Sequence, residues 1–171
     1  MGETTRIAWR AAYASLVKWW LQNQWFPPAV KAREFFVCRI CAETGAHIVI
    51  DRNPTFSSTI HMGDCVRIGR DGELHGGDRL GDHVLMAQEV IVCIVDHEHG
   101  SLDMSIDLQG DTEMRLIYVD NDVWLGRCVM VMPGVHIGDG CIDAAGAGVV
   151  KNVPSFSIVG GGAGRGHRIA A

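Results

Sequence analysis

The sequence lacks several features that would decide its class at once. No apolar run among its 171 residues reaches the roughly 18–20 residues that a membrane-spanning helix needs. The uncharged stretch from Ala11 to Val17 runs into Lys18 with no small-residue cleavage site, so we expect no secretory signal peptide. The net charge of −5 argues against non-specific binding to nucleic acid. These absences predict a cytoplasmic globular protein that binds no nucleic acid.

The six cysteines also lack the spacing of a known site. They are spread along the chain at Cys38, Cys41, Cys65, Cys93, Cys128 and Cys141. Cys38-x-x-Cys41 is a lone pair, because no second pair follows at the spacing of a zinc ribbon. In a chain without an export signal this usage predicts reduced thiols, and we interpret the pair as small buried residues. We expect no metal.

What the chain does contain is a strict six-residue period. The repeated apolar positions are Ile50, Phe56, Met62, Ile68, Leu74, Leu80, Met86 and Val92, then Val119, Leu125, Val131, Ile137 and Val149. An α-helix of 3.6 residues per turn cannot keep this period on one face, whereas a solenoid built from hexads can. Glycine often follows the repeated residue, as in Leu125-Gly126, where we expect it to permit turn conformations. The pattern predicts an all-β solenoid.

The register breaks between the two series, from about residue 95 to residue 116. This stretch is polar and contains His97 and His99. A solenoid can eject such a segment as a loop without disturbing its stack, and long loops on rigid scaffolds tend to carry function. We therefore predict a helical cap over residues 1–44 and a β-solenoid domain over residues 45–169, with an ejected loop at residues 95–116.

Four segments of the later repeats carry a specific resemblance to a known family. They are Val123-Trp124-Leu125-Gly126, M-P-G-V-H-I-G-D-G from Met132, V-V-K-N-V-P from Val149, and S-I-V-G-G from Ser157. As a set they resemble V-W-I-G, L-P-G-V-T-I-G-D-G, V-T-K-D-V-P and S-I-V-A-G of the hexapeptide-repeat acyltransferases, nearest the galactoside, maltose and capsule-polysaccharide O-acetyltransferase branch. The resemblance implies a left-handed parallel β-helix, a homotrimer and acetyl-CoA as cosubstrate.

Three single positions and the terminal motif depart from the family pattern. Asp143 occupies a core slot that is usually isoleucine, so we expect either a distorted coil or a polar partner for its carboxylate. Arg127 replaces a small residue, and Val150 replaces a threonine. The terminal G-N-P-A-K motif is G-G-A-G-R here, from residue 161 to Arg165, and so lacks the proline.

The loop histidines are the candidates for acid–base chemistry. Asp96-His97 sits where the family places its catalytic histidine, and imidazole suits the removal of a hydroxyl proton near neutral pH. We predict His97 as the general base and His99 as the reserve. Asp96 or Glu89 is the candidate for orienting the ring. The alternative from the residues alone is a loop of ordinary solvated histidines.

The same resemblance assigns six residues to coenzyme A: Trp124, Gly126, Arg127, Ala145, Lys151 and Arg165. By resemblance Trp124 lines the cleft of the pantetheine arm, and Lys151 meets a phosphate as a point charge. The residues alone also allow Trp124 to be a packing residue between subunits and Lys151 to be simply solvated. We expect a backbone N–H near residues 125–127 to stabilise the thioester oxyanion.

Apolar residues recur at a spacing of 3–4 over residues 4–23, which predicts a helix that ends before Pro27-Pro28. Aromatic residues cluster at its far end, at Trp19, Trp20, Trp25 and Phe26, and the first 42 residues hold six basic against two acidic side chains. We interpret this segment as a cap over the first coil, because solenoids need one. The alternative is peripheral membrane contact through residues 1–30, with tryptophan at the interface and basic residues facing anionic lipid.

The sequence therefore predicts an acetyl-CoA-dependent O-acetyltransferase that acts on a hydroxyl of a sugar or polysaccharide precursor, with direct attack on the thioester. One alternative is a non-catalytic β-helix scaffold or assembly protein. A weaker alternative is a zinc enzyme similar to the β-helical carbonic anhydrases. That family shows an H-x-x-x-x-H pair, whereas the close pair here is His97-x-His99.

Overall fold

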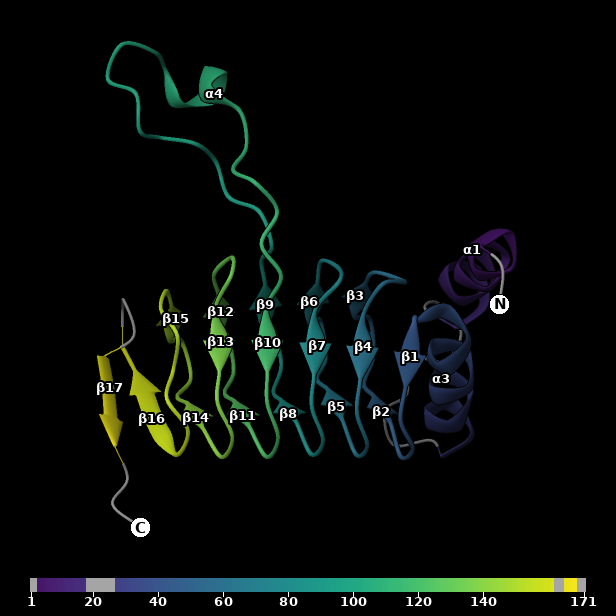
Figure 1. The fold of residues 1–171 in the computed structure, drawn as a ribbon. Coiled ribbons are helices and arrows are strands. Elements are labelled where there is room, and N and C mark those ends of the chain that lie inside the picture. Colours follow the sequence, from purple (N-terminus) through teal and green to yellow (C-terminus); the bar gives the residue numbers. More distant parts are fainter. Residues whose placement is uncertain (1–2, 18–26, 162–164, 169–171) are drawn as a thin grey trace.

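Most of the chain winds into a column of short parallel strands, and the computed structural model describes residues 3–17, 27–161 and 165–168 (Figure 1). The strands form three sheets along the column. The first sheet contains β1 (Glu43–Thr44), β4 (His61–Met62), β7 (Arg79–Leu80), β10 (Tyr118–Val119) and β13 (His136–Ile137). The second contains β2 (Val49–Ile50), β5 (Arg67–Ile68), β8 (Leu85–Met86), β11 (Trp124–Leu125), β14 (Ile142–Asp143), β16 (Ser157–Gly160) and the antiparallel β17 (Arg165–Arg168). The third contains β3 (Thr55–Phe56), β6 (Glu73–Leu74), β9 (Ile91–Val92), β12 (Met130–Val131) and β15 (Gly148–Val149).

The register shows why the sequence repeats every six residues. Ile50 pairs with Ile68 in the next coil, so one coil consumes three hexads and each hexad supplies one strand. All the repeated apolar residues are buried, as predicted, and each adds about 1.5–3 kcal/mol of hydrophobic stabilisation. β1 begins at Glu43, within the range predicted for the cap.

The corners between strands depend on residues in the left-handed region. His83, Glu89 and Cys128 have φ values of 59°, 61° and 57°, although none is glycine. The glycines that follow the repeated residues serve another purpose than the predicted one. A Cβ on Gly126 would lie 2.7 Å from the Asp143 carbonyl oxygen, so glycine is needed for close approach between coils and not for the turn.

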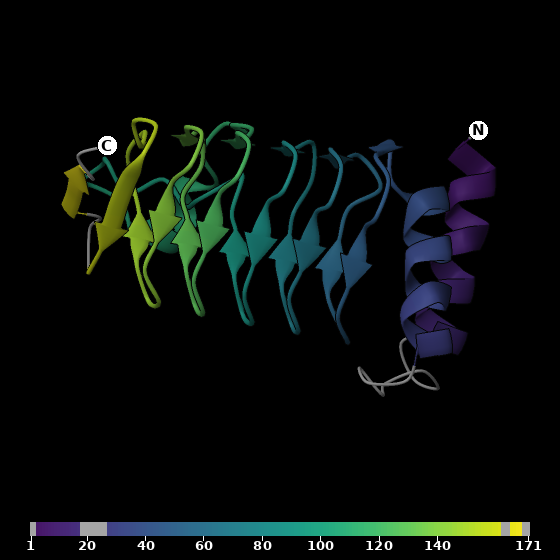
Figure 2. The same ribbon diagram turned by 90° about the horizontal axis from the view of Figure 1, so that it is seen from below.

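Helices close one end of the column (Figure 2). α1 (Glu3–Ala12) continues into η1 (Tyr13–Val17), in agreement with the predicted helix as far as the structure describes it. α3 (Pro27–Ile40) was not predicted. Its prolines stand at the first helical positions, where a missing N–H costs nothing. The buried Arg33 donates from Nε to the Ile50 carbonyl oxygen at 2.7 Å and so fastens α3 to the first coil.

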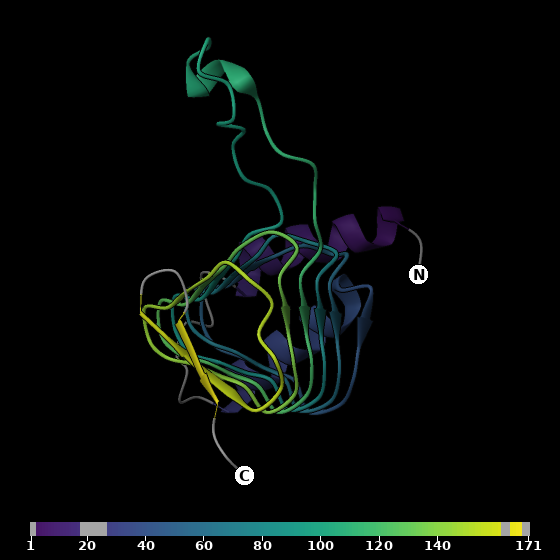
Figure 3. The ribbon, with the colours of Figure 1, turned by 60° about the vertical axis from the view of Figure 1, so that its left-hand side comes forward.

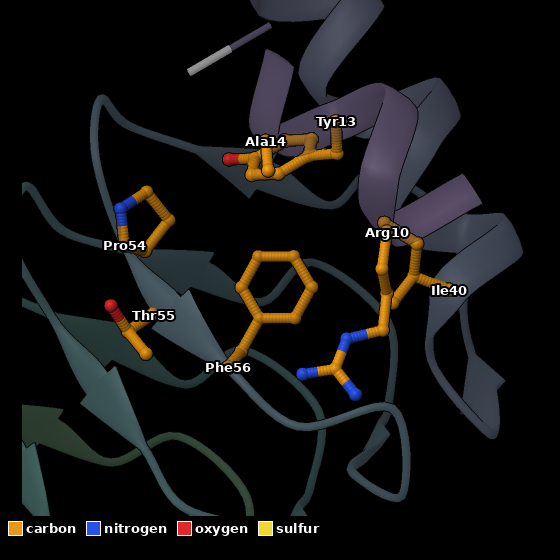
Figure 4. Close-up of a pocket in the computed structure, with 7 residues that line it drawn as sticks. All are labelled: Arg10, Tyr13, Ala14, Ile40, Pro54, Thr55 and Phe56. Atoms are coloured by element: carbon orange, nitrogen blue, oxygen red, sulfur yellow. The ribbon is translucent and has the colours of Figure 1, made fainter. Parts of the chain in front are cut away.

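A hollow of about 170 Å³ lies between the cap and the first coil (Figure 4). The rings of Tyr13 and Phe56 meet edge to face across it, with 5.5 Å between centroids. Burial raises the pKa of Tyr13 to about 12. These contacts show that the cap covers the first coil, as predicted.

The alternative of peripheral membrane contact is not tested by these helices. Trp19, Trp20, Trp25 and Phe26 lie outside the described residues. Within the described ranges, no helix is long and apolar enough to cross a bilayer.

The predicted loop leaves the column between β9 and β10 and carries the short helix α4 (Ile106–Gln109) (Figure 3). The two arms of the loop pair with each other at its neck. Glu98 N–H donates to the Gly110 carbonyl oxygen at 2.9 Å, and Thr112 N–H donates to the Asp96 carbonyl oxygen at 2.7 Å. Beyond the neck the segment extends away from the coils (Figures 1 and 3). Paired corner positions are 18 residues apart in an ordinary coil but 39 apart where the loop is inserted.

Candidate active site

The neck of the loop holds a histidine against a carboxylate. His97 and Asp111 face each other as an antiparallel bridge, and His97 Nδ1 lies 2.8 Å from Asp111 Oδ1. The neutral imidazole thus donates its Nδ1 proton to the carboxylate, which leaves Nε2 as the acceptor. The two side chains are 76% and 64% exposed, so the pair contributes little to stability. What it provides is a fixed tautomer and an accessible base.

The predicted orienting groups do not contact this ring. Asp96 Oδ1 instead accepts the backbone N–H of His97 at 2.8 Å, and Glu89 pairs with Arg127. Sequence reasoning missed Asp111, because its approach depends on pairing across an aperiodic loop. His99, the reserve base, is hydrogen-bonded through Nδ1 to the His97 carbonyl oxygen at 3.1 Å.

A groove of about 410 Å³ runs over the second sheet. Leu85, Met86, Ala87 and Trp124 give it an apolar lining, while its polar lining comes from Asp51, Arg67, Gln88 and Arg127. Trp124 and Leu85 are directly paired strand residues, and their side chains are 48% and 42% exposed. The groove therefore combines an apolar floor with cationic groups, and it includes two of the residues predicted for coenzyme A.

Two of the other predicted positions, Gly126 and Ala145, adjoin this region at the corner after β11. Gly126 approaches the backbone of Ala145 in the next coil, and Gly146 N–H donates to the Arg127 carbonyl oxygen at 2.7 Å. Gly126 N–H donates to the Asp143 carbonyl oxygen at 2.7 Å, so this amide is engaged in the ladder and unavailable to an oxyanion. Within the described part of the chain, the Arg127 N–H makes no hydrogen bond and is the remaining donor of the expected segment.

Lys151 lies in a later coil, nearer the C-terminal end of the column. It follows β15 and is exposed. Arg165 begins β17, but its side chain lies outside the described part of the structure.

The core contains the carboxylate of Asp143, at the slot where the sequence predicted it. Asp143 is fully buried, and β14 keeps its register, with Leu125 on one side of Asp143 and Val159 on the other. Both carboxyl oxygens lack a hydrogen-bond partner among the described residues, so neither the distorted coil nor the polar partner expected from the sequence is found. Burial raises the pKa of Asp143 to about 6. Asp78, also buried, accepts the Ile117 N–H, and burial raises its pKa to about 6 as well.

A single chain does not bring the histidine and the groove together. The loop leaves the corner between the third and first sheets, which is the corner opposite the second sheet. Figure 1 shows the loop above the column, while β5, β8 and β11 lie along its lower edge. The loop that carries His97 therefore leaves the column at the corner opposite the sheet that holds the groove of the same chain.

The described part of the chain shows no ready ligand set for metal chemistry. No group of three or more histidine, cysteine, aspartate or glutamate side chains within the described ranges is arranged to hold a metal ion. All six cysteines are free of disulfide bonds.

Comparison with known proteins gives a consistent picture. No family model matches the chain. The chain is 28% identical to a protein named as the colanic acid biosynthesis acetyltransferase WcaF of Escherichia coli, over 80% of this chain and 77% of that protein. It is 26% identical to the galactoside O-acetyltransferase of Escherichia coli, over 81% and 69% of the two chains.

Among solved structures, the chain superposes on a hexapeptide-repeat acetyltransferase of Vibrio cholerae complexed with acetyl-CoA. The TM-score is 0.68 at 23% identity, over 95% of this chain and 87% of that one. This likeness confirms the predicted fold class, a left-handed parallel β-helix with an N-terminal helical cap and one ejected loop.

Proposed function

We propose that this chain, a hexapeptide-repeat acyltransferase like the relatives it matches, transfers an acetyl group from acetyl-CoA to a hydroxyl of a sugar or polysaccharide precursor. The His97–Asp111 pair is the observation that carries the proposal, because a fixed tautomer with an exposed Nε2 is what a general base for a hydroxyl requires. The groove beside Trp124 supplies the second requirement, a site for an extended, partly apolar thioester.

The proposed reaction is a direct transfer. His97 Nε2 removes the acceptor hydroxyl proton as the oxygen attacks the thioester carbonyl carbon. Asp111 stabilises the imidazolium that forms, by the hydrogen bond to Nδ1. The tetrahedral intermediate then collapses with cleavage of the carbon–sulfur bond, and the leaving thiolate takes the proton from His97. The new ester and free coenzyme A balance the reaction.

Residues in the groove and beside it are the candidates for binding coenzyme A. Trp124 packs along the pantetheine arm, Gly126 and Ala145 permit close approach of the backbone, and the Arg127 N–H is the candidate donor to the oxyanion. Arg127, Lys151 and Arg165 are the candidates for the phosphates.

We also propose that three copies assemble so that each site lies between two chains. The opposite placement of loop and groove supports this, because a base and a cofactor cleft that face away from each other need a second copy. Exposed apolar side chains on the loop offer contact area: Leu102, Met104, Ile106, Leu108 and Met114. An exposed apolar set of this kind is typical of an interaction surface.

The names of two relatives support a sugar acceptor, and one structural neighbour supports this donor. One relative is named for colanic acid biosynthesis and one for galactosides, and the Vibrio cholerae structure contains acetyl-CoA. The direct test is incubation of the protein with acetyl-CoA and a panel of free and nucleotide-linked sugars, with mass spectrometry of the products. An acetylated acceptor supports the proposal. No product together with no binding of coenzyme A favours the scaffold alternative.

Peripheral membrane contact through residues 1–30 remains a separate proposal, which would suit a lipid-linked acceptor. Ile7 on α1 and Phe35 on α3 are exposed at 59% and 45%, and exposed Arg10 lies on α1. Co-sedimentation with anionic liposomes tests it. Loss of binding when residues 1–30 are removed is the expected result, provided that the truncated chain keeps its circular dichroism spectrum, whereas unchanged binding contradicts the idea.

A further inference from the structure

Arg127 carries a bidentate ion pair at the edge of the groove. Its Nη2 lies 3.0 Å from Glu89 Oε1 and 3.1 Å from Oε2, and its Nε lies 3.3 Å from Oε2. Glu89 and Arg127 come from corners of neighbouring coils that stack directly, since Cys128 N–H donates to the Gln88 carbonyl oxygen at 3.0 Å. The coil geometry thus places the guanidinium beside this carboxylate at the edge of the groove.

Glu89 has further partners besides Arg127. Cys128 Sγ lies 3.2 Å from Oε2, and Arg70 Nη2 lies 3.5 Å from Oε1. The hydrogen bond from Cys128 and those from Arg127 hold the pKa of Glu89 below its ordinary value. If the Arg127 guanidinium moved away, Glu89 would keep a thiol donor and a cation. Breaking this pair therefore leaves no stranded carboxylate, and the usual penalty for separating a charge pair is small here.

Arg127, by contrast, is not enclosed by the protein. Its side chain is 58% exposed, and it lines the groove together with Trp124. A guanidinium presents a planar fork of donors, which binds phosphate bidentately with the same geometry as carboxylate. The groove thus has at one edge a cation whose present partner is a carboxylate and whose geometry also suits a phosphate.

We propose that Arg127 exchanges partners when coenzyme A binds. In the free protein it pairs with Glu89, and in the complex it turns to a phosphate of coenzyme A while Arg70 and Cys128 retain Glu89. Glu89 is then a built-in competitor that sets the affinity for the cofactor. This inference rests on the proposed function, because it concerns the same groove.

The test measures binding of coenzyme A and of pantetheine, which has no phosphate, by isothermal titration calorimetry. Arg127→Ala is expected to weaken coenzyme A binding about tenfold, as for the loss of one charge-assisted contact. Glu89→Gln is expected to strengthen it about threefold or more, because the competing charge is removed. Neither variant should change pantetheine affinity. Arg79→Ala, which removes an exposed cation from β7 of the first sheet, is the matched control and should bind both compounds as the wild type does.

A double variant identifies the exchange itself. In an Arg127→Ala background, Glu89→Gln should give no further gain, because there is no guanidinium left to release. Equal coenzyme A affinity in wild type and Arg127→Ala would overturn the inference, and so would weaker binding by Glu89→Gln. Absence of binding of both compounds to the wild type would instead overturn the proposed function. Thermal unfolding of each variant verifies that the coils remain intact.

Discussion

His97 Nδ1 lies 2.8 Å from Asp111 Oδ1 across the neck of an otherwise extended loop. The neck continues the hydrogen-bonded pairing of the column, so the rigid scaffold reaches as far as this pair. Rotation of the imidazole would break its contact with the carboxylate. In this position the hydrogen bond favours the tautomer that carries its proton on Nδ1.

The first prediction concerns this carboxylate. Asp111→Asn should lower kcat about tenfold or more, because an amide cannot stabilise the imidazolium and allows the wrong tautomer. Asp103→Asn, a change at another exposed carboxylate of the same loop, should leave kcat unchanged. Steady-state rates with saturating acetyl-CoA measure both. Equal rates for wild type and Asp111→Asn would show that the pair does not act in catalysis.

The second prediction concerns stability as a function of pH. Burial raises the pKa of Asp78 and Asp143 from 3.8 to about 6, so the folded state favours their neutral forms. Their contribution to stability is fully present below pH about 4 and is lost as the pH rises through about 6. Each carboxyl group lowers the free energy of unfolding by about 3 kcal/mol as the pH rises across this window. Urea unfolding should therefore give a free energy of unfolding that falls between pH 4 and pH 7.

Asp143→Val isolates one of the two groups. Valine fills the slot with an apolar side chain of similar size, so the variant should unfold at a temperature roughly 5–10 °C higher than the wild type at pH 8. The gain should shrink as the pH falls toward 4, because the wild-type carboxyl is then neutral. The account of Asp143 fails if wild type and variant show the same dependence on pH.

The third prediction compares two glycines. Gly126→Ala should lower the free energy of unfolding by about 2 kcal/mol or more, because the new Cβ would meet backbone atoms of Asp143 and Ala145 at 2.7 Å. Gly100→Ala, in the loop, has no atom within 4 Å of its Cβ and should be neutral. Chemical denaturation of both variants checks the difference. Comparable stability of the two would mean that the coils can separate at low cost.

The fourth prediction concerns assembly. Replacement of Ile106 and Leu108 by serine should weaken the trimer, because both side chains are exposed in one chain, at 58% and 69%. Light scattering after size-exclusion chromatography measures the mass at decreasing concentration. Replacement of exposed Met130, which lies on β12 of the third sheet, provides a control away from the loop. A monomeric wild type would contradict the proposed assembly outright.

Sequence periodicity predicted the column because burial in each hexad is a local property, as at Ile68 and Leu74. The second cap helix was not predicted because buried Arg33 interrupts its apolar face, and its hydrogen bond to the distant Ile50 carbonyl group cannot be read from the local sequence. Asp111 was not predicted as the partner of His97 for a related reason. Their contact arises from pairing across a loop that has no sequence period. Contacts between segments far apart in sequence leave no local signal.

The most direct measurement follows thiol release from acetyl-CoA with a panel of sugar acceptors, for wild type and His97→Ala side by side. The account predicts acceptor-dependent release by the wild type and a loss of about 100-fold or more in the variant, because the general base is gone. Turnover that survives the substitution would contradict the role of His97 and make His99 the next candidate. No release with any acceptor, together with no binding of coenzyme A, would contradict the acetyltransferase itself.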